Sequence, residues 1–151
     1  MIRLVKEGWY KNEAKLEEKI KNMSWEGIVD YKTLVILSVD TILNDPELSD
    51  YNWDTENITE IDNGAYQGTL LYIIPRDTYQ PSEYDYLMTC VGYGSCSGCD
   101  SLEAIRNYEG GPVTQSEALQ LKGLCRDILT SLIKPYNYGW RNIEMFNHEV
   151  I

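Results

Sequence analysis

Two apolar runs joined by a polar connection constrain this fold more than any other feature of the sequence. Residues 69–74 are almost continuously apolar, and residues 84–91 are rich in aromatic and β-branched side chains. Such runs are typical of β-strands. The stretch RDTYQPSEY that connects them suits a hairpin but is longer than a tight turn. We therefore predict two neighbouring antiparallel strands, 69–74 and 84–91.

Helical patterns precede this hairpin. Apolar residues recur at helical spacing near the N-terminus, which predicts an amphipathic helix with a break near Gly8 or Asn12. Residues 31–44 are ambiguous, because their β-branched content favours a strand while their length favours a helix. We interpret them as a buried helix that is capped by Asp30 or Thr33 and ends before Pro46. The N-terminal stripe consists of Val5, Trp9, Leu16, Ile20 and Met23.

Two further helices follow the hairpin. Asp100 and Glu103 fit a capping pattern that opens a short helix over 100–107. Thr114 and Glu117 form a second capping pattern, which opens a longer helix over 115–134, and we expect Pro135 to end it. We predict no convincing strand after that helix, and an aromatic tail that packs back on the body. A loop rich in acids fills 45–64, with a short strand near 57–61.

These elements predict an α+β fold in one domain, residues 1–151. In this fold a small antiparallel sheet, the hairpin 69–74/84–91, packs against N-terminal and C-terminal helices. A chain of 151 residues can bury a sizeable core without cross-links. Lys6 and Glu7 stand where a signal peptide is apolar, and no run is long enough to span a membrane, so we expect a cytoplasmic protein.

The net charge of −11 is concentrated in the middle of the chain. Residues 25–110 carry sixteen acidic and three basic residues, and no Lys or Arg occurs from residue 33 to residue 75. Such a field repels nucleic acids and membrane phosphates, so we expect neither as a partner. This negative charge suits binding to a basic protein surface, or it serves only to keep the protein in solution. The acidic surface that we predict consists of Asp45, Glu47, Asp50, Asp54, Glu56, Glu60 and Asp62.

The stretch GYGSCSGCDSLEAI, residues 92–105, is the one local motif with chemistry behind it. It places Cys96 and Cys99 in C-x-x-C spacing before a helix. Three interpretations are open: a redox pair, half of a zinc site, and a tight turn in which glycines and short polar side chains only shape the backbone. Four cysteines in a chain of this length predict reduced thiols rather than a disulfide framework.

The turn interpretation agrees best with the neighbouring residues. Asp100 beside Cys99 opposes a thiolate, and Cys125 lies on the apolar stripe of a helix, where a free cysteine ordinarily serves as core. A turn of this kind can still bind a ligand through exposed N–H groups. We therefore predict no catalytic residue and no cofactor, with Cys96 and Cys99 as the metal ligands if zinc binds.

The segments AYQGTLLYIIPRDTYQPSEYDYLM and YGSCSGCDSLEAI, with the tail IKPYNYGWR, resemble a set of uncharacterised small proteins of tailed bacteriophages. The resemblance covers roughly residues 60–141. It implies a phage or prophage origin and action inside a bacterial cell, and it carries over no catalytic residue. It directs attention to the YQG element and to the loop after the second strand. The candidate binding residues are Tyr66, Gln67, Gly68, Tyr93, Ser95, Cys96, Ser97, Gly98, Cys99 and Asp100.

The function that we expect from these features is non-enzymatic binding. We expect most of the Tyr and Trp side chains in the core. The others would enrich an acidic surface in Tyr and Trp that covers a basic host protein, such as a defence or regulatory component, and inhibits it. We leave open whether the chain forms homo-oligomers. The alternatives are a pocket for a nucleotide or zinc at the Gly92–Asp100 loop, and a C-x-x-C thiol redox protein.

Overall fold

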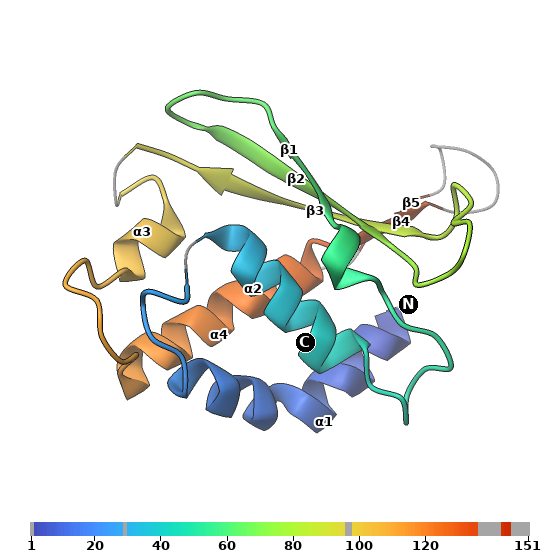
Figure 1. Ribbon diagram of the computed structural model, residues 1–151, viewed down its shortest axis with the longest axis horizontal. Helices are drawn as coiled ribbons and strands as arrows, with labels where there is room; N and C mark the ends of the chain where they lie inside the picture. Colours follow the sequence, from blue (N-terminus) through green and yellow to red (C-terminus); the bar gives the residue numbers. More distant parts are fainter. Residues whose placement is uncertain (1, 29, 96–97, 136–142, 146–151) are drawn as a thin grey trace.

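The computed structural model describes residues 2–28, 30–95, 98–135 and 143–145 (Figure 1). Helices and strands alternate in groups along the chain, as expected for an α+β fold. The sheet contains β1 (Thr59–Asp62), β2 (Gly68–Pro75), β3 (Tyr86–Tyr93), β4 (Ile133–Pro135) and β5 (Ile143–Met145). The helices are α1 (Ile2–Lys21), α2 (Tyr31–Ser38), α3 (Ser101–Ile105) and α4 (Gln115–Thr130), with a π-helical turn at Val39–Leu43 and a 3-10 turn at Thr55–Asn57.

The five strands form one antiparallel sheet in the order β1-β2-β3-β4-β5. The hairpin of β2 and β3 is its centre and pairs without interruption from Gly68–Tyr93 to Pro75–Tyr86. By contrast, β3 pairs with β4 only at Met88 and Ile133. The ladder on this side of β3 is therefore much shorter than the ladder on the β2 side.

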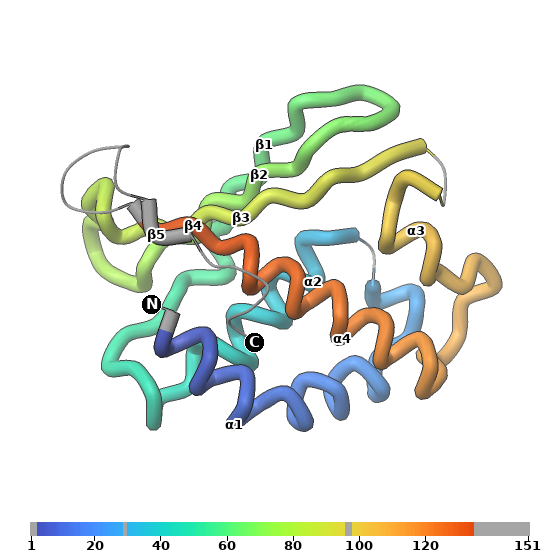
Figure 2. The backbone as a smooth tube through the Cα atoms, turned by 180° about the vertical axis from the view of Figure 1, so that it is seen from behind, coloured from blue at the N-terminus to red at the C-terminus, as the bar shows by residue number. Residues whose placement is uncertain are grey.

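All helices lie on one side of the sheet (Figure 1). In both views α2 and α4 lie directly against the sheet, and α1 lies beneath them (Figure 2). The sheet face toward the helices carries Tyr72, Ile74, Leu87 and Thr89, which are buried at alternate positions of β2 and β3. This alternation follows from the two-residue period of a strand. The α+β prediction is confirmed.

The N-terminal stripe forms one side of the core, since Val5, Trp9, Leu16 and Ile20 are all buried. The helix is continuous from Ile2 to Lys21, so the predicted break is wrong. The role of Gly8 is in packing. Because it has no side chain, α1 can approach the carbonyl group of Ile42 in the π-helical turn.

Residues 31–44 are helical, as we interpreted them. Asp30 caps α2, and its carboxylate accepts a hydrogen bond from the Thr33 amide at 3.0 Å. The helix then widens into the π-helical turn, and the Asn44 amide donates to the carbonyl of Val39 at 3.0 Å. The Asn44 side chain pairs with the backbone of Trp53 at 2.7 and 2.9 Å, which fixes the start of the acidic loop.

Three boundaries differ from the sequence prediction. The second strand of the hairpin is Tyr86–Tyr93 rather than 84–91, because the Asp85 carboxylate accepts hydrogen bonds from the amide and hydroxyl of Ser82 and closes the preceding turn. The expected short strand near 57–61 is β1 at Thr59–Asp62. The short helix over 100–107 is Ser101–Ile105, with Asp100 as its N-cap.

The largest error concerns the C-terminal helix, which ends at Thr130 rather than at 134. The hydroxyls of Thr130 and Ser131 donate to backbone carbonyls of the last turn, at 3.0 Å to Arg126 and 2.7 Å to Asp127. The chain then leaves the helix and forms β4 and β5, which the sequence analysis did not predict. Strand β5 is the described part of the tail, and the rest of the predicted aromatic tail lies outside the described residues.

No helix among the described residues has both the length and the apolar character that crossing a membrane requires.

Candidate functional site

Asp100 positions the loop between β3 and α3, residues 94–100, through its hydrogen bonds. Only 7% of Asp100 is exposed. Its carboxylate accepts hydrogen bonds from the amides of Leu102 at 3.1 Å and Glu103 at 3.2 Å, as an N-cap does. It also accepts from the Tyr31 hydroxyl at 2.7 Å, and from the Gly94 amide at 3.3 Å. One carboxylate thus joins the start of the loop, its end and the helix layer.

Tyr31, the first residue of α2, completes this network from below. Its hydroxyl donates to Asp100 and accepts from the Leu102 amide at 2.9 Å. Burial, together with the neighbouring carboxylate of Asp100, raises the pKa of the Tyr31 hydroxyl. The hydroxyl therefore stays protonated and acts as a donor throughout the physiological range, which suits a positioning contact rather than acid–base catalysis.

Gly94 is required by close packing. A Cβ at this position would lie 2.5 Å from the sulfur and 2.8 Å from the Cβ of Cys99. Its φ is not in the left-handed region, and neither is that of Gly92, where a Cβ would meet nothing. The turn interpretation is thus supported at Gly94 through backbone approach rather than positive φ.

Among the described cysteines, each is in a different state. Cys99 is disulfide-bonded and exposed, Cys90 is an exposed free thiol, and Cys125 is a buried free thiol. The expectation of reduced thiols is therefore wrong at Cys99. The number of cysteines in a chain does not predict whether one exposed loop has the local geometry of a disulfide. Cys96 and Ser97 lie outside the described residues, whereas Ser95 and Gly98 are exposed.

The YQG element reaches the same end of the sheet as this loop. Gly68 begins β2 directly opposite Tyr93, the last residue of β3. The Tyr93 hydroxyl donates to the carboxylate of Asp62 at 2.6 Å, so the two strands and β1 are tied together there. Tyr66 and Gln67 lie exposed in the β1–β2 connection, and Tyr66 is 84% exposed. The structure thus brings Gly68 and Tyr93 together and leaves Tyr66 without a buried contact.

The acidic residues divide into two groups by their contacts. Asp45 and Glu47 both form ion pairs with Lys11 of α1, and the Asp45 contact measures 2.8 Å. This hydrogen bond from Lys11, with others from Asn12 and the Glu47 amide, lowers the pKa of Asp45 to about 2. In the second group no acid has an ion-pair partner within the described part of the chain: Asp50, Asp54, Glu56, Glu60 and Asp62.

The tryptophans do not contribute to the acidic surface where the structure describes them. Trp9, Trp25 and Trp53 are buried in the core. The exposed aromatic residues are tyrosines, including Tyr66 and Tyr79. The expectation of a surface rich in both Tyr and Trp therefore holds for tyrosine alone among these residues, because the larger indole rings fill the interior.

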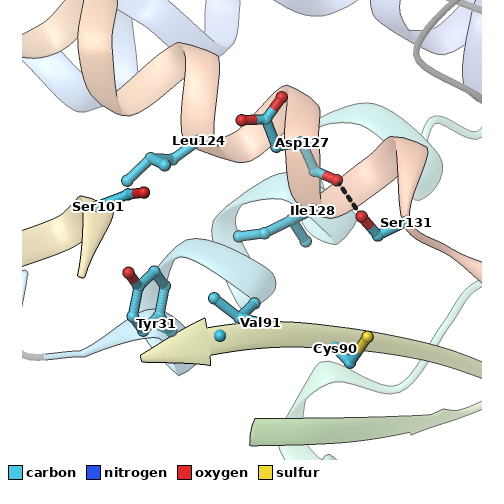
Figure 3. A pocket seen from close by; sticks show the side chains of 9 residues that line it. Tyr31, Cys90, Val91, Ser101, Leu124, Asp127, Ile128 and Ser131 are labelled. Carbon is cyan, nitrogen blue, oxygen red and sulfur yellow. Dashed lines mark hydrogen bonds between the residues drawn. The ribbon is translucent and has the colours of Figure 1, made fainter. Parts of the chain in front are cut away.

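A pocket that the sequence did not indicate lies beside the loop (Figure 3). It has a volume of about 190 Å³ between β3, the start of α3 and the C-terminal half of α4. Its residues lie far apart in the sequence, and no local pattern unites them. The lining residues are Tyr31, Cys90, Val91, Gly92, Ser101, Leu124, Asp127, Ile128 and Ser131.

The size of this pocket argues against a nucleotide as its ligand. Sites for drug-sized ligands and cofactors usually enclose roughly 300–1,000 Å³. A volume of about 190 Å³ is smaller and suits a single side chain. Its walls are mixed, since Leu124 and Ile128 are apolar while Ser101 and Ser131 carry hydroxyls.

No family model matches the chain, and neither curated proteins nor solved structures gave a match. The resemblance to tailed-bacteriophage proteins stays a prediction.

Proposed function

We propose that this chain is a small non-enzymatic binding protein that docks on a basic surface of a partner protein through its acidic face. We define the acidic face as Asp50, Asp54, Glu56, Glu60 and Asp62 with the segments that carry them. The observation that supports it most is the lack of ion-pair partners for these five carboxylates in the described structure. The chain offers no Lys or Arg between residues 33 and 75 to neutralise them.

The arrangement of these acids favours an extended partner. They are distributed over a loop, the 3-10 turn and the edge strand β1 (Figure 1). All four residues of β1 are exposed, including Glu60 and Asp62. Charges spread in this way along one edge of a sheet suit a basic surface of similar extent, which would pair with several of them at once.

Electrostatics also sets how such a complex would behave. Complementary charges on two proteins accelerate their encounter, and salt weakens this attraction because the Debye length is about 10 Å at 0.1 M. Individual exposed pairs contribute only about 0.2–1 kcal/mol each, so affinity would come from their number. Binding should therefore be fast and strongly dependent on salt.

The partner that we propose is a bacterial host protein with a basic groove, such as a defence or regulatory protein that binds nucleic acid. The resemblance to bacteriophage proteins supports the host compartment, and the acidic face would compete with nucleic acid for the groove.

The polar groups of the 94–100 loop support a non-enzymatic role. Asp100 and Tyr31 form hydrogen bonds with each other and with the first amides of α3, so these groups position the loop.

The test is affinity capture from bacterial lysate with matched charge variants. The variant Glu56→Gln/Glu60→Gln removes two charges from the acidic face, and the control Glu18→Gln/Glu109→Gln removes two exposed charges elsewhere. A partner that binds as proposed should lose about 2- to 30-fold in affinity with the first variant and stay unchanged with the second. Its binding should also weaken between about 50 and 200 mM salt.

Two outcomes contradict the proposal. One is a captured partner whose affinity is equal for both variants. The other is a partner whose binding is indifferent to salt. In either case the acidic face serves only solubility.

Thiol–disulfide exchange is the second candidate function, because Cys99 is exposed and disulfide-bonded. Its surroundings do not favour a reactive thiolate, since Asp100 follows directly and α3 has only five residues to offer a dipole. Equilibration with glutathione buffers decides between the two. A reduction potential below about −300 mV identifies a structural disulfide, whereas one near those of known oxidoreductases, about −120 to −270 mV, supports redox activity.

A further inference from the structure

Among the described residues, one edge of strand β3 has no strand partner at Cys90–Gly92. On the β2 side every residue from Tyr86 to Tyr93 has a paired residue. On the other side, the pairing with described residues is limited to Met88 with Ile133. In an antiparallel sheet, alternate residues direct their N–H and C=O groups to opposite edges. The stretch from Cys90 to Gly92 therefore presents backbone groups on the open edge without a strand partner among the described residues.

The pocket lies along this open edge (Figure 3). Cys90, Val91 and Gly92 form its floor, and Leu124 and Ile128 of α4 face them. A strand edge and a helix thus enclose this pocket of about 190 Å³, and we call the pocket together with the open edge at Cys90–Gly92 the groove. Ser101, at the start of α3, lies at one side of the cavity and is exposed.

We propose that this groove binds an extended segment of a partner protein, which adds to the sheet beside Cys90–Gly92 and inserts one apolar side chain into the pocket. The open edge identifies the occupant as polypeptide in strand conformation, because only such a segment presents N–H and C=O groups at matching spacing. The cavity identifies the inserted group, since its volume suits one side chain and Leu124 and Ile128 supply apolar walls.

Charge narrows the class of segment further. The whole chain carries a net charge of −11. A segment that carries Lys or Arg next to its apolar residue is therefore favoured over an acidic one. In such complexes the backbone hydrogen bonds supply affinity, and the pocket supplies specificity.

This inference does not rest on the acidic face. Strand β1, which carries Glu60 and Asp62, lies beyond β2, whereas the groove lies on the opposite side of β3. Variants of the acidic face therefore leave the groove intact, and variants of the groove leave the acidic face intact. An experiment can thus contradict one proposal without contradicting the other.

The test uses a displayed library of random peptides of eight residues, the length of β3, selected on the full chain. We expect enriched peptides that alternate apolar and polar residues, carry a basic residue, and shift the amide NMR signals of Cys90–Gly92. Filling the pocket with Ser101→Trp should weaken their binding about 10- to 100-fold, as expected for losing one buried apolar side chain. The matched control Ser116→Trp, in the first turn of α4, should bind like the wild type.

A second measurement does not depend on any protein variant. The amides of a bound peptide strand fall into two alternating sets, and only one set faces the open edge. N-methylation of that set should abolish binding, whereas N-methylation of the other set should leave these hydrogen bonds intact. The proposal is overturned if no peptide is enriched, if enriched peptides bind the Ser101→Trp variant as well as the wild type, or if N-methylation of neither set has an effect. Protection from hydrogen exchange, in the free monomer, of those Cys90–Gly92 amides that point away from β2 would also overturn it, since the chain itself would then occupy the groove. A dimer that pairs through this edge would overturn it likewise.

Discussion

Two glycines inside helices, Gly8 and Gly123, provide a sharp test of the packing described above. Gly8 lies in α1 and Gly123 lies in α4. A Cβ on Gly8 would overlap the carbonyl oxygen of Ile42 and lie 3.2 Å from its Cγ2. A Cβ on Gly123 would meet nothing within 4 Å. The same substitution by alanine should therefore change the stability in opposite directions.

The magnitudes follow from two opposing effects. In a helix interior, alanine is more favourable than glycine by about 0.8–1.0 kcal/mol. Gly123→Ala should realise this gain in full, which raises Tm by about 2–4 °C for a chain of this size. Gly8→Ala has the same gain, but the overlap costs about 1–3 kcal/mol or more. Because the Ile42 oxygen belongs to the backbone and cannot rotate away, we expect the upper part of that range and a net loss of about 1–2 kcal/mol.

The assay is equilibrium unfolding in urea, monitored by far-UV circular dichroism. Each variant should shift the midpoint with an unchanged m-value, since neither alters the surface exposed on unfolding. The two effects should add in the double variant, because the sites share no partner. A Gly8→Ala variant at least as stable as the wild type would refute the close approach of α1 to the π-helical turn, whatever Gly123→Ala does.

Three further predictions test the loop anchor, the acidic loop and the thiols. Tyr31→Phe should destabilise the fold by about 1–3 kcal/mol in urea unfolding, because the buried carboxylate of Asp100 loses a donor; an unchanged midpoint would contradict this. The pKa of Asp45 is lowered from 3.8 to about 2, so its contribution to stability is present above pH 4 and is lost as pH falls from 4 to 2. Asp45→Asn should therefore flatten the fall in stability in that window, and an unchanged slope would exclude the contact as its cause. Burial raises the pKa of the Cys125 thiol to about 12, whereas Cys90 is exposed; peptide mapping after alkylation at pH 8 should show modified Cys90 in the native protein and modified Cys125 only after unfolding.

The elements that sequence patterns located well are those whose signals are local. Thr114 and Glu117 form the capping box that the sequence predicts, with hydrogen bonds of 2.9 and 3.2 Å. Asp100 caps α3 as expected. The central hairpin was also predictable, because its two short runs are rich in aromatic and β-branched residues and are separated by a polar connection. In each case a few adjacent residues contain the whole physical cause.

The candidate site was less predictable, because its parts come together through tertiary contacts. The sequence singled out the Gly92–Asp100 loop and the YQG element, and the register of the hairpin brings Gly68 opposite Tyr93. It did not indicate Tyr31 as the partner of Asp100, since the two lie 69 residues apart. Trp9, Trp25 and Trp53 are buried, which agrees with the core role expected for most of the Tyr and Trp residues.

The end of α4 shows how one missed boundary conceals a site. Pro135 was the predicted stop signal, yet the helix ends at Thr130, where the hydroxyls of Thr130 and Ser131 donate to carbonyls of its last turn. The early exit lets Ile133 pair with Met88, and the neighbouring Thr89 of β3 donates to the carbonyl of Ile128 in α4 at 3.1 Å. A helix that continued to 134 would leave no residues for β4 and would not place a strand at the first half of this edge. Strand β4 therefore depends on an early helix end that the sequence analysis overlooked, and Ser131, directly after that end, lines the pocket beside Cys90–Gly92.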